Sequence, residues 1–538
     1  MTFSRARLFA PLQRFFRDPA FRQLLRFCAP ALLVGLALRV ALTASMPYAY
    51  IQYDSADFFS TVSQWFEQHR VHIHFKRSFL TPVLFLLPFA LHLRPFLLIP
   101  AAQHLMGLWG TLIVGSLVRS WFRWWKIAIF PVTIIFAASP WVIWYEHTIM
   151  GEAQYLFFTL LMVWAGTRLA QRRTGGAFAF FLVSLVLVMG TRLEAKLYFA
   201  FAFMLVAFVF WKRWRLLVPC VAVLVLAAVI TFLMGGKREG SGLAYATLIK
   251  LTPDHLKSEP AVEPYVMPIR DEVRRDFPDY PADLIKIDKT VQATIETYVA
   301  SWQRDIKKWD DEKAKILRNL CLEAVKAHPV EALILPLTKF ALATDAWSAY
   351  AFDTESLGVG QQHAVTLKPW VPAVVGRGTT GRVMSDDEAR MWVADHYNPR
   401  RVAWFENYEK AWNQARIALR LPDRHMSQSR WIHDYYGGVP HPYSTFPGMP
   451  IYFIAAFAGM LAAIARPHRL GMLHLAWVLT MLGDLYVVSM VAVTNARFRF
   501  AYEPFALIYF FLLFDCVAEW IAARRAGRSR VVSEPAAA

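Results

Sequence analysis

Residues 119–173 read RSWFRWWKIAIFPVTIIFAASPWVIWYEHTIMGEAQYLFFTLLMVWAGTRLAQRR, and this stretch decides the fold class. Two basic clusters, 119–126 and Arg172–Arg173, enclose two apolar runs that are joined by a short polar loop at 145–152. Membrane helices are apolar runs of about 20 residues, and basic residues remain on the cytoplasmic side. The stretch is therefore typical of a helical hairpin in a bilayer, with its polar loop on the non-cytoplasmic side.

The composition of the whole chain agrees with a membrane protein. Of its 538 residues, 56% are hydrophobic and 18% are charged, and the net charge is +18. A soluble protein of this length carries more charge. The positive excess lies in short clusters beside apolar runs and not along a basic stripe. We therefore expect it to set membrane topology, and we expect no binding of nucleic acid.

The apolar runs and the basic clusters together predict a topology. Ten segments have the length and apolarity of a membrane helix: 27–46, 96–118, 127–145, 153–170, 176–191, 195–211, 214–234, 448–465, 470–493 and 503–523. Six basic clusters flank them: Arg5 to Arg26, 119–126, Arg172–Arg173, 212–215, 466–469 and 524–530. If all six are cytoplasmic, the ten segments alternate without conflict and both chain ends lie inside. We predict an all-α polytopic membrane protein with about ten transmembrane helices.

Two further apolar stretches, 78–93 and 330–347, would break this alternation if either one crossed the membrane. Each contains proline, and we expect both to be interfacial or re-entrant segments that lie against protein. The first apolar run of the chain is long for a signal peptide, so we expect an uncleaved anchor there.

This topology divides the chain into three regions. They are a transmembrane core (1–234) with a first external loop (47–95), an external region (235–447), and C-terminal transmembrane helices with a cytoplasmic tail (448–538). Within the external region, apolar residues recur at helical spacing over 299–329, which predicts an amphipathic helix. A short helix is expected near 402–420.

The first external loop carries two carboxylates and several basic residues. Asp54 and Asp57 would share one face of a helix over 54–69, although Asp54 is also a favoured helix N-cap. Lys76 and Arg77 suit a phosphate group, one as a point charge and the other as a bidentate fork. His74 belongs to an H-x-H pair, which is weak evidence for a metal and is equally compatible with the face of an edge strand.

Other external loops place further charged residues on the same side of the membrane. The acidic ones are Glu152 and Glu194, and the basic ones are Arg192, Arg497 and Arg499. Each also has an ordinary structural explanation. Glu152 suits a helix N-terminus, Arg192 can pair with Glu194, and the late arginines can pair with a carboxylate or reach lipid headgroups. Arg39 and Asp484 lie inside apolar segments, where an ionisable group is functional or forms a structural pair.

These motifs resemble those of the GT-C membrane glycosyltransferases. The matching stretches are YDSADFF (53–59), KRSFLTP (76–82), SPWVIWYEHTIMGEAQYLFFTLL (139–161), GTRLEA (190–195) and RFRFAYEPFALIYF (497–510). The sequence is most similar to bacterial relatives of the protein O-mannosyltransferases and of the lipid A aminoarabinose transferases. The resemblance covers about 45–235 well, and 448–520 in outline.

The resemblance implies transfer of a sugar from a polyprenyl-phosphate donor, such as undecaprenyl phosphate, on the periplasmic face of a bacterial inner membrane. In this family an aspartate of the first external loop is the proposed general base, and Asp54 matches it, with Asp57 as its competitor. Lys76 and Arg77 match the basic residues that hold the donor phosphate. The late basic element that matches Arg497 and Arg499 is expected to assist them.

The remaining matches are less specific. Glu152 and Arg192 match an acidic and a basic family position, while Glu194 and His74 remain further candidates for the active site. Because the first loop lacks the adjacent Asp-Glu of the protein mannosyltransferases, we expect an envelope lipid or glycan as the acceptor. Paired carboxylates suit Mg²⁺ or Mn²⁺, but the family contains metal-dependent and metal-independent members, so the cofactor stays open.

Two other classes of function compete with this reading. A lipid or solute transporter would place charged groups deep in several helices and would break segments near the midplane. An O-antigen ligase or polymerase would use a polyprenyl-pyrophosphate donor and would place its essential arginines in a late external loop, where this chain has 398–406 and Arg424. Donor specificity distinguishes the two kinds of transferase.

Overall fold

A computed structural model describes residues 18–51, 55–71, 73, 77–192, 194–234, 329, 371–396, 398–418, 449–466, 468–491 and 500–532. In these residues the regular structure is helical, apart from isolated bridge residues at Tyr50, Ile73 and Thr148, of which Tyr50 and Thr148 pair with each other. The all-α prediction is therefore confirmed for this part of the chain. The amphipathic helix predicted over 299–329 and the apolar stretch 330–347 lie outside the described residues, apart from Pro329.

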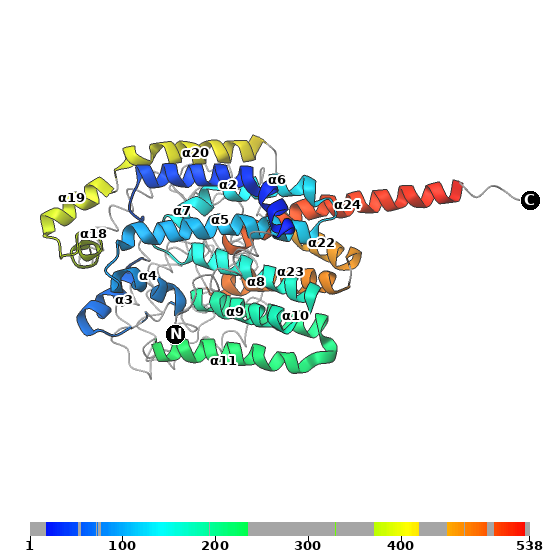
Figure 1. The fold of residues 1–538 in the computed structure, drawn as a ribbon, viewed down its shortest axis with the longest axis horizontal. Helices are drawn as coiled ribbons and strands as arrows, with labels where there is room; N and C mark the ends of the chain where they lie inside the picture. Colours follow the sequence, from blue (N-terminus) through cyan, green and yellow to red (C-terminus); the bar gives the residue numbers. More distant parts are fainter. Residues whose placement is uncertain are drawn as a thin grey trace, which may run out of the picture.

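The helices run side by side in one bundle (Figure 1). Those before residue 235 are α2 (Pro19–Ser45), α3 (Ser55–Gln68), α4 (Leu80–Ala90), α5 (Pro95–Trp121), α6 (Trp125–Ala137), α7 (Pro140–Glu146), α8 (Glu152–Arg172), α9 (Gly175–Thr191), η1 (Glu194–Leu197), α10 (Tyr198–Val209), η2 (Trp211–Leu216) and α11 (Leu217–Met234). Those after residue 370 are η5 (Val371–Val375), α18 (Gly376–Thr380), α19 (Asp386–His396), α20 (Pro399–Ala418), α22 (Met449–Ala465), α23 (His468–Val491) and α24 (Glu503–Val532).

Several of these helices have the length and composition of membrane spans. Five qualify on their own: Pro19–Ser45, Pro95–Trp121, Lys212–Ile230, Arg469–Val487 and Phe500–Ala522. The pair α6 and α7 would form a sixth span, bent by 48°. Four other apolar helices in the described chain have 10–17 residues, which is shorter than an untilted crossing requires. The molecule is a helical membrane protein, and ten crossings remain a prediction.

The short helix α4 occupies the first apolar stretch that was expected not to cross. It has 11 residues, so it is about 16 Å long, roughly half the thickness of the hydrocarbon layer. The amphipathic pattern over 54–69 corresponds to α3, and the helix expected near 402–420 corresponds to α20.

The bend between α6 and α7 follows from Pro140. Proline at the first position of α7 disfavours helical backbone in the residue before it, which is extended (φ −60°, ψ 119°). Such a break frees backbone carbonyls in an apolar span, and protein groups must bond them. Arg39 Nη1 donates to the carbonyl of Ala137 at 2.9 Å, and the Tyr408 hydroxyl donates to that of Ala138. These hydrogen bonds stabilise the bent conformation of the span.

The same arginine forms a buried ion pair with the last residue of α7. Arg39 Nε donates to Glu146 Oε2 at 2.6 Å, and Nη2 donates to Oε1 at 2.7 Å. Both side chains are only 2% exposed. A buried charge needs both a partner and hydrogen bonds, and a bidentate pair supplies them. The pair fixes α2 against α7, and Gly107 of α5 lies directly against it.

Helix α8 packs against α5, α9 and α23, and most of its residues are buried. A Cβ atom at Gly166 would lie 3.2 Å from Leu205 and 3.3 Å from Phe201, so the glycine allows α10 to approach closely. Small residues at helix contacts are the usual means of close packing in membranes. The two ends of α8 therefore place their side chains at opposite ends of the bundle.

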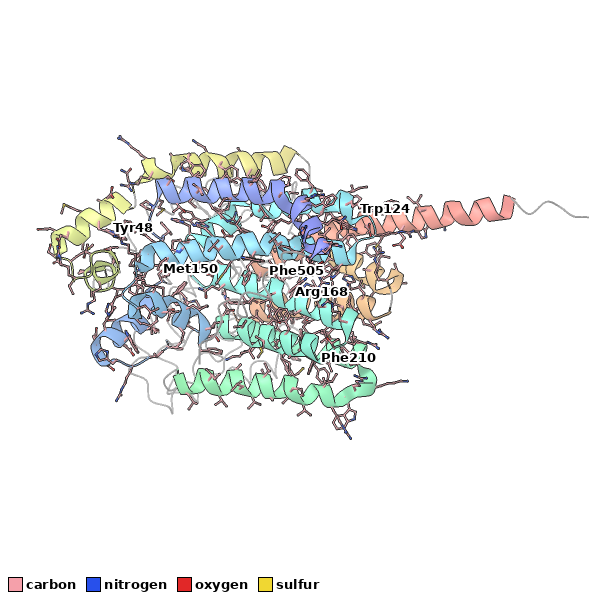
Figure 2. All side chains as sticks on the ribbon, in the orientation of Figure 1. Tyr48, Trp124, Met150, Arg168, Phe210 and Phe505 are labelled. Atoms are coloured by element: carbon pink, nitrogen blue, oxygen red, sulfur yellow. The ribbon has the colours of Figure 1, made fainter. Side chains whose placement is uncertain are left out.

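The basic clusters lie together at one end of the bundle, which we name the basic end. Its described parts are Arg22, Arg26, 119–126, Arg172–Arg173, 212–215, Arg466 and 468–469, and the sixth cluster, 524–530, lies in the part of α24 that continues past the bundle. Figure 2 shows Trp124, Arg168 and Phe210 toward this end, and Tyr48 and Met150 toward the opposite end, which we name the outer end. The common location of these clusters agrees with their predicted placement on one side of a membrane.

Two carboxylates of α24, Asp515 and Glu519, lie at the basic end. Asp515 accepts hydrogen bonds from the backbone N–H groups of Arg123 and Trp124 at 3.0 and 2.8 Å, just before α6 begins. Arg466 pairs with Asp515 and also with Glu519, at 2.6 Å from the latter. Because a helix start has N–H groups without helical partners, a distant carboxylate can stabilise it. Beyond this cluster, α24 continues past the bundle (Figure 1).

Helix α20 lies along α2 at the side of the bundle (Figure 1). Trp404 Nε1 donates to Ser45 Oγ at 2.9 Å, and the Phe405 ring stacks on Trp144 with ring centroids 5.8 Å apart. Helix α20 is therefore packed onto α2 and α7.

We predict that Gly107→Ala disrupts the Arg39–Glu146 pair. A Cβ atom at position 107 would overlap the Glu146 carboxylate and lie 2.8 Å from Arg39 Nη2. Separation of a buried pair costs about 3–5 kcal/mol of the free energy of unfolding. Thermal unfolding of the purified protein in detergent should show this loss.

Gly483→Ala is the matched control for this prediction. Gly483 lies within α23, and a Cβ atom there would meet nothing within 4 Å. Helix propensity then favours alanine by up to about 1 kcal/mol. Equal unfolding midpoints for the two variants would show that the pair does not depend on the space at Gly107.

Candidate functional site

The chain after α2 is fixed against the loop between α7 and α8. The backbone N–H of Tyr50 donates to the carbonyl of His147 at 2.8 Å, and that of Ile149 donates to the carbonyl of Tyr50 at 2.9 Å. At the start of α3, Ser55 Oγ donates to the carbonyl of Ile149 at 2.8 Å. These bonds bring the first external loop against the loop that leads into α8.

A second joint connects the start of α4 to the end of α9. Ser78 Oγ donates to the carbonyl of Met189 at 2.9 Å, and Thr81 Oγ1 donates to that of Thr191 at 3.3 Å. The last carbonyls of a helix lack partners within the helix, so these hydroxyl groups satisfy them. At Gly151, before α8, a Cβ atom would lie 3.3 Å from the methyl group of Thr81. Three loops that are distant in sequence therefore meet at the outer end.

One Asp–Arg ion pair lies at this meeting point. Arg77 Nε donates to Asp57 Oδ2 at 2.9 Å, and Arg77 Nη2 lies 2.8 Å from the same oxygen. The side chains are 19% and 21% exposed, so small molecules can reach the pair. The Arg77 guanidinium also lies 5.0 Å from the centroid of the Phe58 ring, an arrangement that restricts its orientation.

A second ion pair joins the start of α8 to the end of α9. Arg192 Nη1 donates to Glu152 Oε1 at 3.1 Å, with side chains that are 10% and 3% exposed. Glu152 also lies in the first turn of α8, where the helix dipole favours a negative charge. This ion pair links the end of α9 to the start of α8. The pairing of Arg192 with Glu194 that the sequence suggested stays a prediction, because the Glu194 side chain lies outside the described residues.

A row of tyrosines leads from Arg192 into the bundle. The guanidinium lies 5.5 Å from the centroid of the Tyr155 ring, and the Tyr155 hydroxyl donates to that of Tyr198 at 2.8 Å. The ring of Tyr198 contacts that of Tyr502, whose hydroxyl donates to Asp484. The row ends at a buried carboxylate in α23, so one network joins α8, α10 and α23 with residues that follow α9 and precede α24.

A second polar network surrounds Glu146. His104 Nδ1 lies 2.9 Å from Glu146 Oε2, and His104 Nε2 lies 3.1 Å from His147 Nδ1. His147 Nε2 lies 3.1 Å from the carbonyl of Tyr48. This network connects α2, α5 and α7 to the chain segment before α3. We assign it a structural role, because its groups are buried and each contact joins two different elements.

Four residues predicted for the site are described and lie at the outer end: Asp57, Arg77, Glu152 and Arg192. The side chains of the other six lie outside the described residues: Asp54, His74, Lys76, Glu194, Arg497 and Arg499. Among the described residues, no group of three or more His, Cys, Asp and Glu side chains is arranged to hold a metal ion.

Sequence reasoning missed the residues of the two polar networks around Glu146 and Arg192. His104 could have been found, because a histidine inside an apolar run is uncommon in membrane helices. Tyr155 and Tyr198 gave no such signal, since aromatic residues are frequent throughout this chain.

Comparisons with protein-family models, with curated proteins and with solved structures gave no match to this chain. The function is therefore inferred from the chemistry of the residues and their arrangement.

We predict that Thr81→Val weakens the joint between α4 and α9. Valine keeps the shape but leaves the carbonyl of Thr191 without its hydroxyl partner, at a cost of about 1–3 kcal/mol. Thr133→Val is the control, because the Thr133 hydroxyl bonds a carbonyl of its own helix, at Ile129. Unfolding midpoints in detergent measure both, and an equal loss for the two variants would contradict the prediction.

Proposed function

We propose that this protein is a membrane glycosyltransferase of the GT-C type, which transfers a sugar from a polyprenyl-phosphate donor to an envelope lipid or glycan. The observation that carries the proposal is the meeting of three loops at the outer end, where two arginines are each held by a carboxylate. The site stands at the end of an apolar bundle, so a lipid-linked donor can reach it from the bilayer.

The reaction requires a base for the acceptor and cations for the departing phosphate. The acceptor oxygen bonds to the anomeric carbon, its proton passes to the base, and the bond from the anomeric carbon to the phosphate oxygen breaks. Displacement in one step inverts the anomeric centre. The polyprenyl phosphate needs no protonation to depart, and fixed cations stabilise the growing negative charge.

Arg77 is well placed to bind the donor phosphate. It is partly exposed, its guanidinium is held by Asp57 and by the Phe58 ring, and a guanidinium can bind a phosphate through two donors. Lys76, its neighbour in sequence, is the second cation that we propose there. Arg192 is almost buried beside Glu152, and we assign it to the support of the site.

The ion pair also separates the roles of the two aspartates. Asp57 Oδ2 is already engaged by the Arg77 guanidinium, so this carboxylate serves to hold the arginine in place. We therefore propose Asp57 as a positioning residue for Arg77 and Asp54 as the general base. The described carboxylates Asp57 and Glu152 are both engaged by arginines and do not assemble a site for a divalent cation, so we derive no step through a metal.

The orientation of the bundle follows from its charges. We propose that the basic end faces the cytoplasm of a bacterial cell and that the outer end faces the periplasm, across the inner membrane. This orientation would place the candidate site where periplasmic acceptors are accessible.

We predict that Asp54→Asn lowers kcat for sugar transfer about 10²–10⁴-fold, as expected for loss of a general base. Asp57→Asn should mainly raise the KM for the donor, because Arg77 loses its anchor. The assay uses the full-length protein with a panel of polyprenyl-phosphate monosaccharides, and unfolding midpoints confirm that both variants are folded.

Three results would contradict these assignments. Near wild-type kcat for Asp54→Asn would exclude it as the base. A loss of kcat alone for Asp57→Asn would transfer that role to Asp57. Transfer only from a pyrophosphate-linked glycan would favour the ligase-like alternative and overturn the proposed donor.

We further predict that the two ends of the bundle label from opposite sides. Met391 on α19 is 65% exposed near the outer end, and Lys126 is exposed at the basic end. In a Cys321→Ser background, Met391→Cys should react with an impermeant maleimide in intact cells. Lys126→Cys should react only after permeabilisation.

The described native cysteines Cys28, Cys220 and Cys516 are buried, so they should give little background. The reverse labelling pattern, or labelling of both variants in intact cells, would overturn the proposed orientation.

A further inference from the structure

A hollow of about 940 Å³ opens at the basic end, far from the candidate site. It lies between the last turns of α8 and α10, the turn η2 and the first turn of α23. The described residues that line it are Ala170, Gln171, Arg173, Phe208, Val209, Phe210, Lys212, Arg213, Arg469 and Leu470. We name this hollow the basic pocket.

Four cations gather around the basic pocket: Arg173, Lys212, Arg213 and Arg469. All four side chains are exposed. Within the described chain, none of them forms an ion pair with a carboxylate, and none of the described lining residues is acidic. Like charges at short range repel, and no described acidic residue of the lining offsets this repulsion. A bound anion would supply the missing counter-charge.

Helix stabilisation does not account for most of these charges. A cation is favourable at a helix C-terminus, which suits Arg173 after α8, but it is unfavourable at an N-terminus. Arg469 lies in the first turn of α23, which has no acidic residue, and Lys212 and Arg213 precede α11. Cations and free N–H groups at a helix start together favour an anion.

The requirement for basic residues on the cytoplasmic side does not account for the pocket either. That requirement concerns the number of basic residues in each loop, and any position in the loop satisfies it. Here three separate loops contribute cations to the same hollow. Arg173 is also fixed in position, because its Nη2 lies 3.5 Å from the carbonyl of Val209 and its guanidinium lies 5.7 Å from the Phe210 ring centroid.

The other lining residues are apolar and indicate what kind of anion fits. Phe208 is 37% exposed, and Val209, Phe210 and Leu470 continue the same wall. Next to them, Trp214 is 66% exposed, as is typical of tryptophan at the headgroup level of a membrane. A wall of this kind contacts acyl chains, whereas a small soluble anion would gain nothing from it.

We propose that the basic pocket binds an anionic phospholipid, with the headgroup phosphate between the four cations and the acyl chains along the apolar wall. Arginine binds phosphate through two parallel donors, and basic pockets between membrane helices are suited to such headgroups. The bound lipid connects the ends of α8, α10 and α23. The inference is independent of the proposed transferase activity.

The test measures thermal unfolding of the full-length protein in a neutral detergent during titration with phosphatidylglycerol. Phosphatidylglycerol should raise the unfolding midpoint, whereas phosphatidylcholine, and inorganic phosphate at the same phosphate concentration, should not. The double variant Lys212→Gln/Arg469→Gln should bind phosphatidylglycerol about 25-fold more weakly, because each basic residue near an anionic headgroup contributes about fivefold.

The control variant Lys126→Gln/Arg524→Gln removes the same charge outside the pocket, at the start of α6 and on α24, and it should bind like the wild type. The variant Lys212→Arg/Arg469→Lys keeps the pocket charge and should retain the response, which separates loss of charge from damage to the fold. Equal weakening in the pocket and control variants would overturn the proposal. Equal stabilisation by phosphatidylcholine, or by inorganic phosphate alone, would also overturn it.

Discussion

The ion pair between Arg39 and Glu146 is the interaction on which the outer half of the bundle depends. It holds α2 against α7 just where Pro140 bends the span, and the same guanidinium bonds a carbonyl that the bend releases. The residues after Glu146 then pair with the chain around Tyr50, which directs the first external loop toward α8. The position of α3, and with it Asp57, is therefore set by a charge pair in the apolar part of the molecule.

The two ends of the bundle use charge in different ways. At the outer end two arginines are engaged by carboxylates: Arg77 by Asp57 and Arg192 by Glu152. Such pairs place cations accurately and keep the site close to neutral, so a phosphate must compete with carboxylates for the guanidinium groups. At the basic end, Arg466 is paired in the same way with Asp515 and Glu519, whereas the cations around the basic pocket are not. The four cations of the basic pocket thus have no described carboxylate that an anionic ligand would need to displace.

The sequence predicted most helix positions, because the signals for them are local. Apolar runs and flanking basic clusters predicted α2, α5, α8, α22 and α23 to within several residues, and the pattern over 54–69 predicted α3. The bend at Pro140 was not predicted, since the run over 127–145 is apolar throughout. The partners of Arg77 and Arg192 also could not be assigned with certainty, because they depend on which helices pack together. Asp54, on which the chemistry depends most, lies outside the described residues, so its role remains a prediction.

The clamp between α2 and α7 also has a consequence for biogenesis. Arg39 and Glu146 are 107 residues apart, so the arginine enters the bilayer well before its partner has been synthesised. Until then, a cation near the outer end of α2 can extend its side chain to the interface, where water solvates it. The first helix therefore assumes its final depth and rotation only after α7 has emerged. Assembly of the outer end is thus coupled to the order of translation, because α2 is synthesised first and is fixed in place only by contact with α7.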